Sequence, residues 1–66
     1  MSMAQKYSNF EYRLGKLAYM GYCEETGGVS LISGDKLPGF DALKPQIQDA
    51  WAAAAMEVAK FFEANK

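Results

Sequence analysis

The side chains that could carry covalent or acid–base chemistry are few in this sequence. Cys23 is the single cysteine, and the 66 residues contain no histidine, so a thiol cannot be activated by an imidazole in the usual way. Glu24 and Glu25 are adjacent, and adjacent side chains on a helix point about 100° apart, so the two carboxylates do not converge on one bond. A metal site built from histidine and cysteine is excluded by the same counts. We therefore expect a protein that is not an enzyme and needs no cofactor.

A glycine- and serine-rich segment supplies further polar groups. In a phosphate-binding loop, Gly-Lys-Ser or Gly-Lys-Thr leads directly into a helix, whereas here Asp35 separates Gly34 from Lys36, so the pattern fails. Two interpretations stay open, a plain turn and a loop whose donors meet an anionic ligand. The ligand-binding candidates in this segment are Ser30, Ser33 and Lys36.

A stripe of aromatic and basic side chains is the most suggestive candidate site. Tyr12, Lys16, Tyr19 and Cys23 recur at i, i+4, i+7 and i+11, the spacing of one helix face. Two phenols beside an ammonium can stack a base and pair with a phosphate, so Tyr12, Lys16 and Tyr19 are predicted to bind a ligand. In the alternative interpretation the tyrosines cover the returning chain and the Lys16 ammonium extends into water.

Two helices are expected to position these groups, the first over about residues 9–25. Ser8 and Glu11 have the spacing of a capping box, and Gly27 suits the left-handed conformation that ends a helix. Two interior glycines, Gly15 and Gly21, are tolerable if a neighbouring helix approaches closely on their side. The expected apolar face of this helix consists of Phe10, Leu14, Leu17, Ala18 and Gly21.

The second helix is predicted over about residues 45–64, because Pro45 suits a first helical position. The alanine run at 52–55 would admit another backbone closely. Residues 26–44 form a long connector, and residues 1–7 and 8–66 are expected to be a flexible N-terminus and a single helical domain. The expected apolar face of the second helix consists of Ile47, Trp51, Ala54, Ala55, Val58, Phe61 and Phe62, and the expected connector anchors are Leu37, Pro38, Phe40 and Leu43.

The composition favours self-association. Half of the residues are apolar and nine are aromatic, whereas a chain of this length buries only about 60% of its surface and one cysteine forms no internal disulfide. The expected fold class is therefore all-α: a two-helix hairpin with a long ordered connector, completed by homo-oligomerisation as a dimer or higher oligomer. The residues predicted at the oligomer interface are Trp51, Ala54, Val58, Phe61 and Phe62.

Charge and hydropathy argue against two partner classes. The formal net charge is −1, and the dispersed lysines and arginine form no basic stripe for duplex nucleic acid. The longest uninterrupted apolar run, 50–56, is too short to cross a bilayer, and the first residues lack a signal-peptide pattern. A lone thiol suits a reducing compartment, so the expected location is the cytoplasm.

Four short motifs follow one another along the chain: Ala-Tyr-x-x-Tyr at 18–22, Gly-x-Ser at 28–30, Leu-Pro-x-aromatic at 37–40 and Ala-Trp-x-Ala-Ala-Ala at 50–55. With the residues around them, about 12–58, they resemble a recurrent group of small tailed-phage and prophage proteins. Phe40 stands where that pattern has tryptophan. The resemblance implies a phage origin, action in the host cytoplasm and an accessory role, and it carries over no catalytic residues.

Small phage accessory proteins of this size act by binding, and by this analogy two functions are expected. The first is a non-catalytic protein that counters host defence by sequestering a nucleotide-type immune signal in an oligomer pocket. The alternative is a protein-binding inhibitor or adaptor that occludes a host enzyme or defence complex. The expected partners are thus further copies of the chain itself, together with an anionic nucleotide or a host protein.

Overall fold

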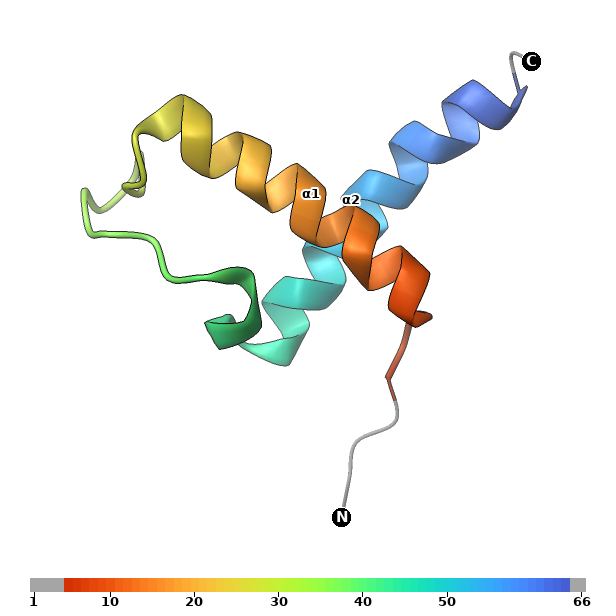
Figure 1. Cartoon of the computed structure of the whole chain (residues 1–66), viewed down its shortest axis with the longest axis horizontal. Helices are drawn as coiled ribbons and strands as arrows, with labels where there is room; N and C mark the ends of the chain where they lie inside the picture. The colour runs from red at the N-terminus through yellow and green to blue at the C-terminus, as the bar shows by residue number, and fades with distance from the viewer. Residues whose placement is uncertain (1–4, 65–66) are drawn as a thin grey trace.

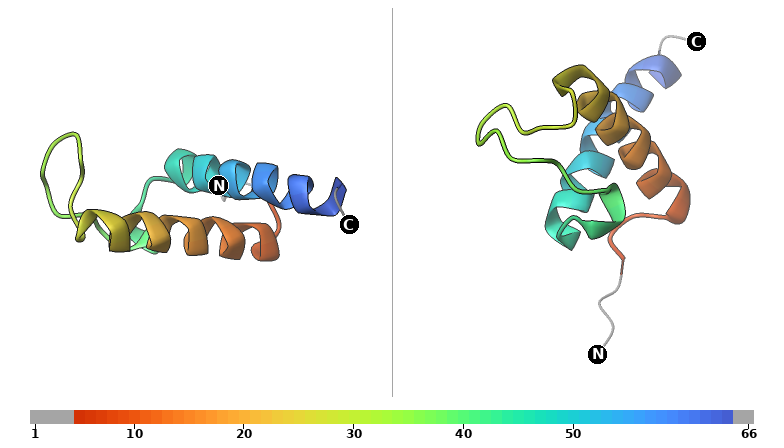
Figure 2. Two further views of the ribbon diagram at one scale, coloured as in Figure 1. Left: turned by 90° about the horizontal axis from the view of Figure 1, so that it is seen from above. Right: turned by 60° about the vertical axis from the view of Figure 1, so that its left-hand side comes forward.

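The computed structural model describes residues 5–64 and consists of two long helices and an ordered connector. α1 spans Asn9–Thr26, the short 3-10 helix η1 spans Phe40–Ala42, and α2 spans Pro45–Ala64. The two long helices cross as an X (Figure 1) and lie in two layers (Figure 2, left). Within residues 5–64, β-pairing is limited to one bridge between Val29 and Lys36. The predicted all-α two-helix hairpin is confirmed, and its completion by further copies stays a prediction.

Both ends of α1 follow local sequence signals. The Ser8 hydroxyl accepts a hydrogen bond from the Glu11 amide at 3.1 Å, and the Glu11 carboxylate accepts one from the Ser8 amide at 2.8 Å, which confirms the capping box. At the other end Gly27 has φ 71° and ψ 23°, the left-handed conformation that glycine adopts readily. The helix runs one residue beyond its expected end, to Thr26.

The helices touch most closely where Gly15 of α1 meets Ala52 of α2. A Cβ atom on Gly15 would lie 2.7 Å from the Ala52 nitrogen and 2.8 Å from its Cα, so a side chain larger than hydrogen does not fit. Ala52 has no exposed surface. The expected close approach at an interior glycine is therefore confirmed at Gly15, whereas the space around Gly21 is open.

An aromatic cluster fills the angle between the helices and holds the connector. The Tyr19 ring, 3% exposed, lies 5.4 Å from the Trp51 ring and 6.0 Å from the buried Phe40 ring, measured between centroids. The Tyr22 ring lies 5.5 Å from the Trp51 ring and 6.5 Å from the Tyr19 ring, so the three rings are mutual neighbours. The Tyr19 hydroxyl donates to the Pro38 carbonyl at 2.7 Å. Phe40 and Pro38 thus anchor the connector as predicted, the first through its ring and the second through its backbone.

The inward faces of the helices differ from the faces that hydropathy predicts. α1 presents Gly15 and Tyr19 to its neighbour, and α2 presents Ala52. The expected apolar faces lie largely in solvent: Phe10 is 64% exposed and Leu17 is 58% exposed. Each helix carries two apolar stripes. The stripe that contains the small residues packs against the other helix, because it allows the closest approach of the two backbones. The more apolar stripe is left on the outside, and its large exposed members are Phe10, Leu17, Ile47, Val58, Phe61 and Phe62.

The segment before α1 reaches the helix through Tyr7. Its ring meets the Tyr12 ring edge-on, with centroids 5.8 Å apart. The first four residues of the expected flexible N-terminus, 1–4, lie outside the described residues. Among residues 5–64, no helix combines the length and the apolarity needed to cross a membrane.

Candidate functional site

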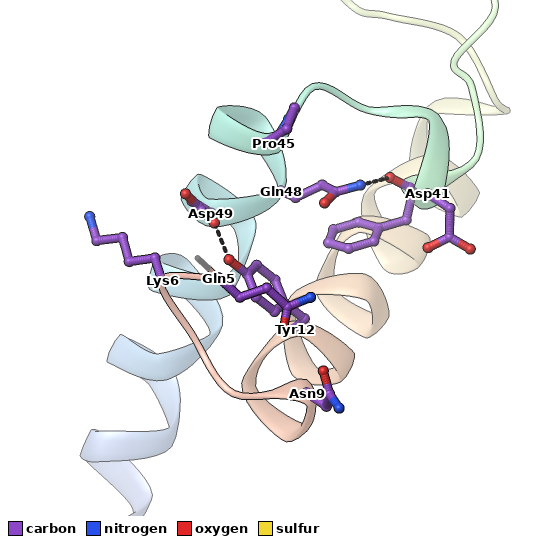
Figure 3. A pocket seen from close by; sticks show the side chains of 9 residues that line it. Gln5, Lys6, Asn9, Tyr12, Asp41, Pro45, Gln48 and Asp49 are labelled. Atoms are coloured by element: carbon purple, nitrogen blue, oxygen red, sulfur yellow. Dashed lines mark hydrogen bonds between the residues drawn. The ribbon is translucent and has the colours of Figure 1, made fainter. Parts of the chain in front are cut away.

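Tyr12 joins the two helices and is only partly available to a ligand. Its hydroxyl donates to the Asp49 carboxylate of α2 (Figure 3). This hydrogen bond, followed by burial, raises the pKa of Tyr12 above its ordinary value, because the carboxylate favours the protonated phenol. Asp49 was not identified from the sequence: no local pattern connects it with a residue 37 positions earlier. Tyr12 therefore mainly links α1 to α2 through this hydrogen bond.

Tyr19, predicted to stack a base, lies in the core. Its ring is enclosed by the aromatic cluster and its hydroxyl is bound to the Pro38 carbonyl, so neither is free for a ligand. Burial is the main cause that raises the pKa of Tyr19, and the neighbouring Cys23 thiol adds to it. The structure corrects the prediction of a ligand-binding Tyr19 and supports the alternative, in which this tyrosine covers the returning connector.

Lys16 lies at the edge of the contact between α1 and η1. Its Nζ is 4.0 Å from an Asp41 carboxylate oxygen, and the two side chains are largely solvated. An ion pair at this distance and exposure contributes little to stability. The Lys16 ammonium thus extends into water, as the alternative interpretation states, and the nearby Asp41 carboxylate competes with any phosphate.

A shallow pocket of about 310 Å³ lies beside Tyr12, between the start of α1, η1 and the start of α2 (Figure 3). Two carboxylates, Asp41 and Asp49, line it together with one ammonium, Lys6. The Gln48 side-chain amide donates to the Phe40 carbonyl at 2.9 Å and so serves the fold. The formal charge of the lining is negative, which opposes an anionic ligand.

Ser30 and Ser33, predicted as ligand donors, fold the connector turn. The Ser30 hydroxyl accepts from the amides of Ile32 and Ser33, both at 3.2 Å, and the Ser33 hydroxyl accepts from the Asp35 amide at 3.2 Å. The Ser30 amide donates to the Asp35 carbonyl at 2.8 Å. Such side-chain bonds to nearby amides are typical of serine turns, so the contacts support the plain-turn interpretation.

The turn also presents two apolar side chains that sequence reasoning did not single out. Leu31 is mostly exposed and Ile32 is 98% exposed. The turn projects beyond the C-terminal end of α1, whereas Tyr12 lies near the opposite end of that helix (Figure 1). The structure therefore does not bring the six predicted ligand-binding residues, Tyr12, Lys16, Tyr19, Ser30, Ser33 and Lys36, into one site.

The predicted oligomer-interface residues divide into two groups. Trp51 is half-buried and packs inside the chain against Tyr19 and Tyr22, so part of its ring is already covered and its place at an oligomer interface stays a prediction. The other four predicted residues, Ala54, Val58, Phe61 and Phe62, are exposed. The rings of Phe61 and Phe62 meet edge-on, with centroids 5.6 Å apart.

Neither a metal site nor a comparison with known proteins points to a function. Across residues 5–64, no three or more histidine, cysteine, aspartate or glutamate side chains are grouped closely enough to hold a metal ion. No protein-family model, curated protein or solved structure matches the chain. The candidate functional surfaces are the outer apolar faces of the two helices, because large apolar side chains are exposed there.

Proposed function

We propose that the chain is a non-catalytic binding protein that associates with itself and covers a surface of another protein. The observation that carries this proposal is the apolar outside of both helices. Phe10 and Leu17 on α1, and Val58 and Phe61 on α2, are all more than half exposed. A large patch of exposed apolar side chains on one side of a helix is typical of a surface that contacts another protein.

A protein partner is favoured over a nucleotide because of the polar groups. A nucleotide site needs free cations and free aromatic faces near one another. Here the Tyr19 ring is enclosed, and Lys16 lies beside Asp41. The pocket next to Tyr12 contains Asp41 and Asp49, whose charges repel phosphates. The exposed apolar side chains of both helices need neither a free cation nor a free aromatic ring to contact another protein.

The resemblance to small phage accessory proteins supplies the kind of partner. It implies a host enzyme or defence complex in the host cytoplasm, whose surface the chain would occlude. The outer face of α1, which we define as Phe10, Leu14, Leu17 and Gly21, is our choice for that contact. Its glycine leaves open space beside Leu17, so a partner side chain can enter there. Met20 lies at its edge and adds an adaptable apolar contact.

A pull-down with the whole chain tests this proposal. Tagged wild-type protein and two variants are incubated with host lysate, and the retained proteins are quantified by mass spectrometry. Leu17→Glu places a charge in the centre of the outer face of α1, while Gln46→Glu makes the same kind of change at an exposed polar position on α2. We expect wild type and Gln46→Glu to retain the same protein in comparable amounts and Leu17→Glu to lose it. Equal retention by all three proteins contradicts the proposal.

A thermal-shift series tests the nucleotide alternative separately. Wild-type protein is heated with cyclic dinucleotides, cyclic trinucleotides and ADP-ribose derivatives at millimolar concentration. Because a ligand that binds the folded state raises the melting temperature, we expect no shift. A reproducible rise with one of these compounds, together with an empty pull-down, would favour nucleotide sequestration instead.

A further inference from the structure

We propose that a second copy of the chain packs antiparallel on the outer face of α2, with the two-fold axis passing beside Ala54. We define the outer face of α2 as Ile47, Ala50, Ala54, Val58 and Phe61. The proposal rests on the self-association proposed above. It adds the helix that mediates it, the relative direction of the two copies and the register between them.

The outer face of α2 is fully formed and lies away from α1. Ala54 follows the buried Ala52 by two residues, which is about 200° around a helix, so the two alanines are on nearly opposite sides. All five residues of the face are exposed, and at about 100° per residue they fall within a stripe roughly 80° wide. Figure 2 (left) shows α2 as a separate layer, and within residues 5–64 no other helix lies on the side of it that faces away from α1. A second helix therefore has direct access to it.

The spacing of the face is symmetric about Ala54. Val58 and Phe61 follow Ala54 by four and seven residues, and Ala50 and Ile47 precede it by the same intervals. In an antiparallel pair centred there, Ala54 meets Ala54 of the second copy, Ala50 meets Val58, and Ile47 meets Phe61. Self-complementarity of this kind is what a two-fold interface requires, because the same patch must serve both copies.

Side-chain size and the helix dipoles agree with that register. Small alanines at the centre allow the two backbones to approach, and the larger Ile47 and Phe61 fill the widening space at each end. Antiparallel helix dipoles favour the same direction.

The exposed area is sufficient for a weak dimer. Phe61 and the adjacent Phe62 are each about two thirds exposed, Val58 is more than half exposed and Ile47 somewhat less. An aromatic side chain buries on the order of 200 Å² when it is fully covered, so these residues together offer roughly 400 Å² per copy. A dimer would bury roughly 800 Å² in total, the size of a weak, transient interface. We therefore expect association that depends visibly on concentration.

Cysteine cross-linking tests the register. In a Cys23→Ser background, one cysteine is introduced at a time, and covalent dimer is measured on non-reducing gels after mild oxidation. Disulfides form only when the two Cα atoms come within about 7 Å, so Ala54→Cys should cross-link with itself. The two Val58 residues would lie about 12 Å apart along the pair, so Val58→Cys should not cross-link with itself, yet it should cross-link readily when mixed with Ala50→Cys. Circular dichroism checks that each variant keeps its helices.

The outcomes separate this proposal from the one on which it rests. Efficient self-cross-linking of Val58→Cys would indicate parallel helices and overturn the register. Absence of a cross-link in a chain that light scattering shows to be dimeric would place the interface elsewhere and overturn the choice of α2. A folded chain that remains monomeric at every concentration would overturn self-association itself.

Discussion

The contact between Gly15 and Ala52 gives the sharpest prediction about how this chain is held together. Replacing Gly15 by alanine would bring a methyl group to 2.7 Å from the Ala52 nitrogen, 2.8 Å from its Cα and 3.0 Å from the Trp51 carbonyl carbon. Carbon atoms prefer separations of about 3.5–4.0 Å. All three neighbours are backbone atoms, so the strain cannot be relieved by turning a side chain. The helices must move apart, and Trp51 must move with them.

Two opposing effects set the size of the change. Forcing an extra methyl group into a packed contact costs about 1–3 kcal/mol, while alanine in place of glycine favours a helix by about 1 kcal/mol. Gly21→Ala is the matched control, because it has the same helix and the same chemistry but nothing within 4 Å of the new methyl group. The propensity gain cancels in the comparison, so Gly15→Ala should be about 1–3 kcal/mol less stable than Gly21→Ala.

Urea and thermal unfolding, followed by circular dichroism at one protein concentration, measure this difference. For a domain of this size each kcal/mol corresponds to a shift in melting temperature of roughly 4–8 °C. Gly21→Ala should melt above wild type and Gly15→Ala clearly below Gly21→Ala. If Gly15→Ala proved as stable as Gly21→Ala, the close crossing of the helices at Ala52 would be wrong.

Three further predictions follow from local contacts. Ser8→Ala removes one half of the capping box and should cost about 1 kcal/mol in urea unfolding; an unchanged midpoint would refute the cap's role. Tyr19→Phe removes the hydrogen bond to the Pro38 carbonyl and should lower the free energy of unfolding by about 1 kcal/mol. Urea unfolding measures this loss, and an unchanged stability would contradict the role of the bond. The pKa of Tyr12 is raised above 10.0 by the Asp49 hydrogen bond, so the folded chain keeps a proton that the unfolded chain loses near pH 10. The stability from this bond is therefore complete below pH 10 and falls as pH rises through the raised pKa. Urea midpoints of wild type should consequently drop more steeply than those of Tyr12→Phe above pH 10, and parallel curves would contradict this.

The positions of the helices could be read from the sequence because short-range signals fix them. The capping box at Ser8, the left-handed Gly27 and the proline at the start of α2 are each local, and each lies where it was expected. The anchoring of the connector through Phe40 was also predictable, since a large apolar ring in a long loop needs cover. The helix ends depend on neighbours within a few residues, and sequence order supplies that information directly.

The orientation of the helices about their own axes could not be read in the same way. Hydropathy selects the most apolar stripe, which on α1 contains Phe10 and Leu17, yet the contact is made by Gly15 and Tyr19. Close approach of small residues and a hydrogen bond for a buried hydroxyl outweigh apolar area at this crossing. The bond between Tyr12 and Asp49 likewise joins residues that no sequence pattern relates. The predicted ligand stripe therefore became mostly a packing surface.

The surfaces left for function are the outer faces of the two helices. Since the tyrosines pack inward, the apolar stripes that hydropathy found are left on the outside of both layers. The outer face of α2 suits a second copy through its symmetry about Ala54, and the outer face of α1 then stays open for another protein. A dimer of this form would present two copies of the α1 face, and two linked contacts bind a repeated or extended surface more tightly than one.

The mass of the whole chain in solution tests the central claim most directly. Light scattering coupled to size-exclusion chromatography, run from low to high micromolar concentration, compares wild type with Ala54→Glu, and Gln46→Glu serves as the charge-matched control. Wild type and Gln46→Glu should rise from the 7.3 kDa monomer to twice that mass, while Ala54→Glu should remain folded and monomeric. A wild-type chain that stays at 7.3 kDa across the range would contradict the account.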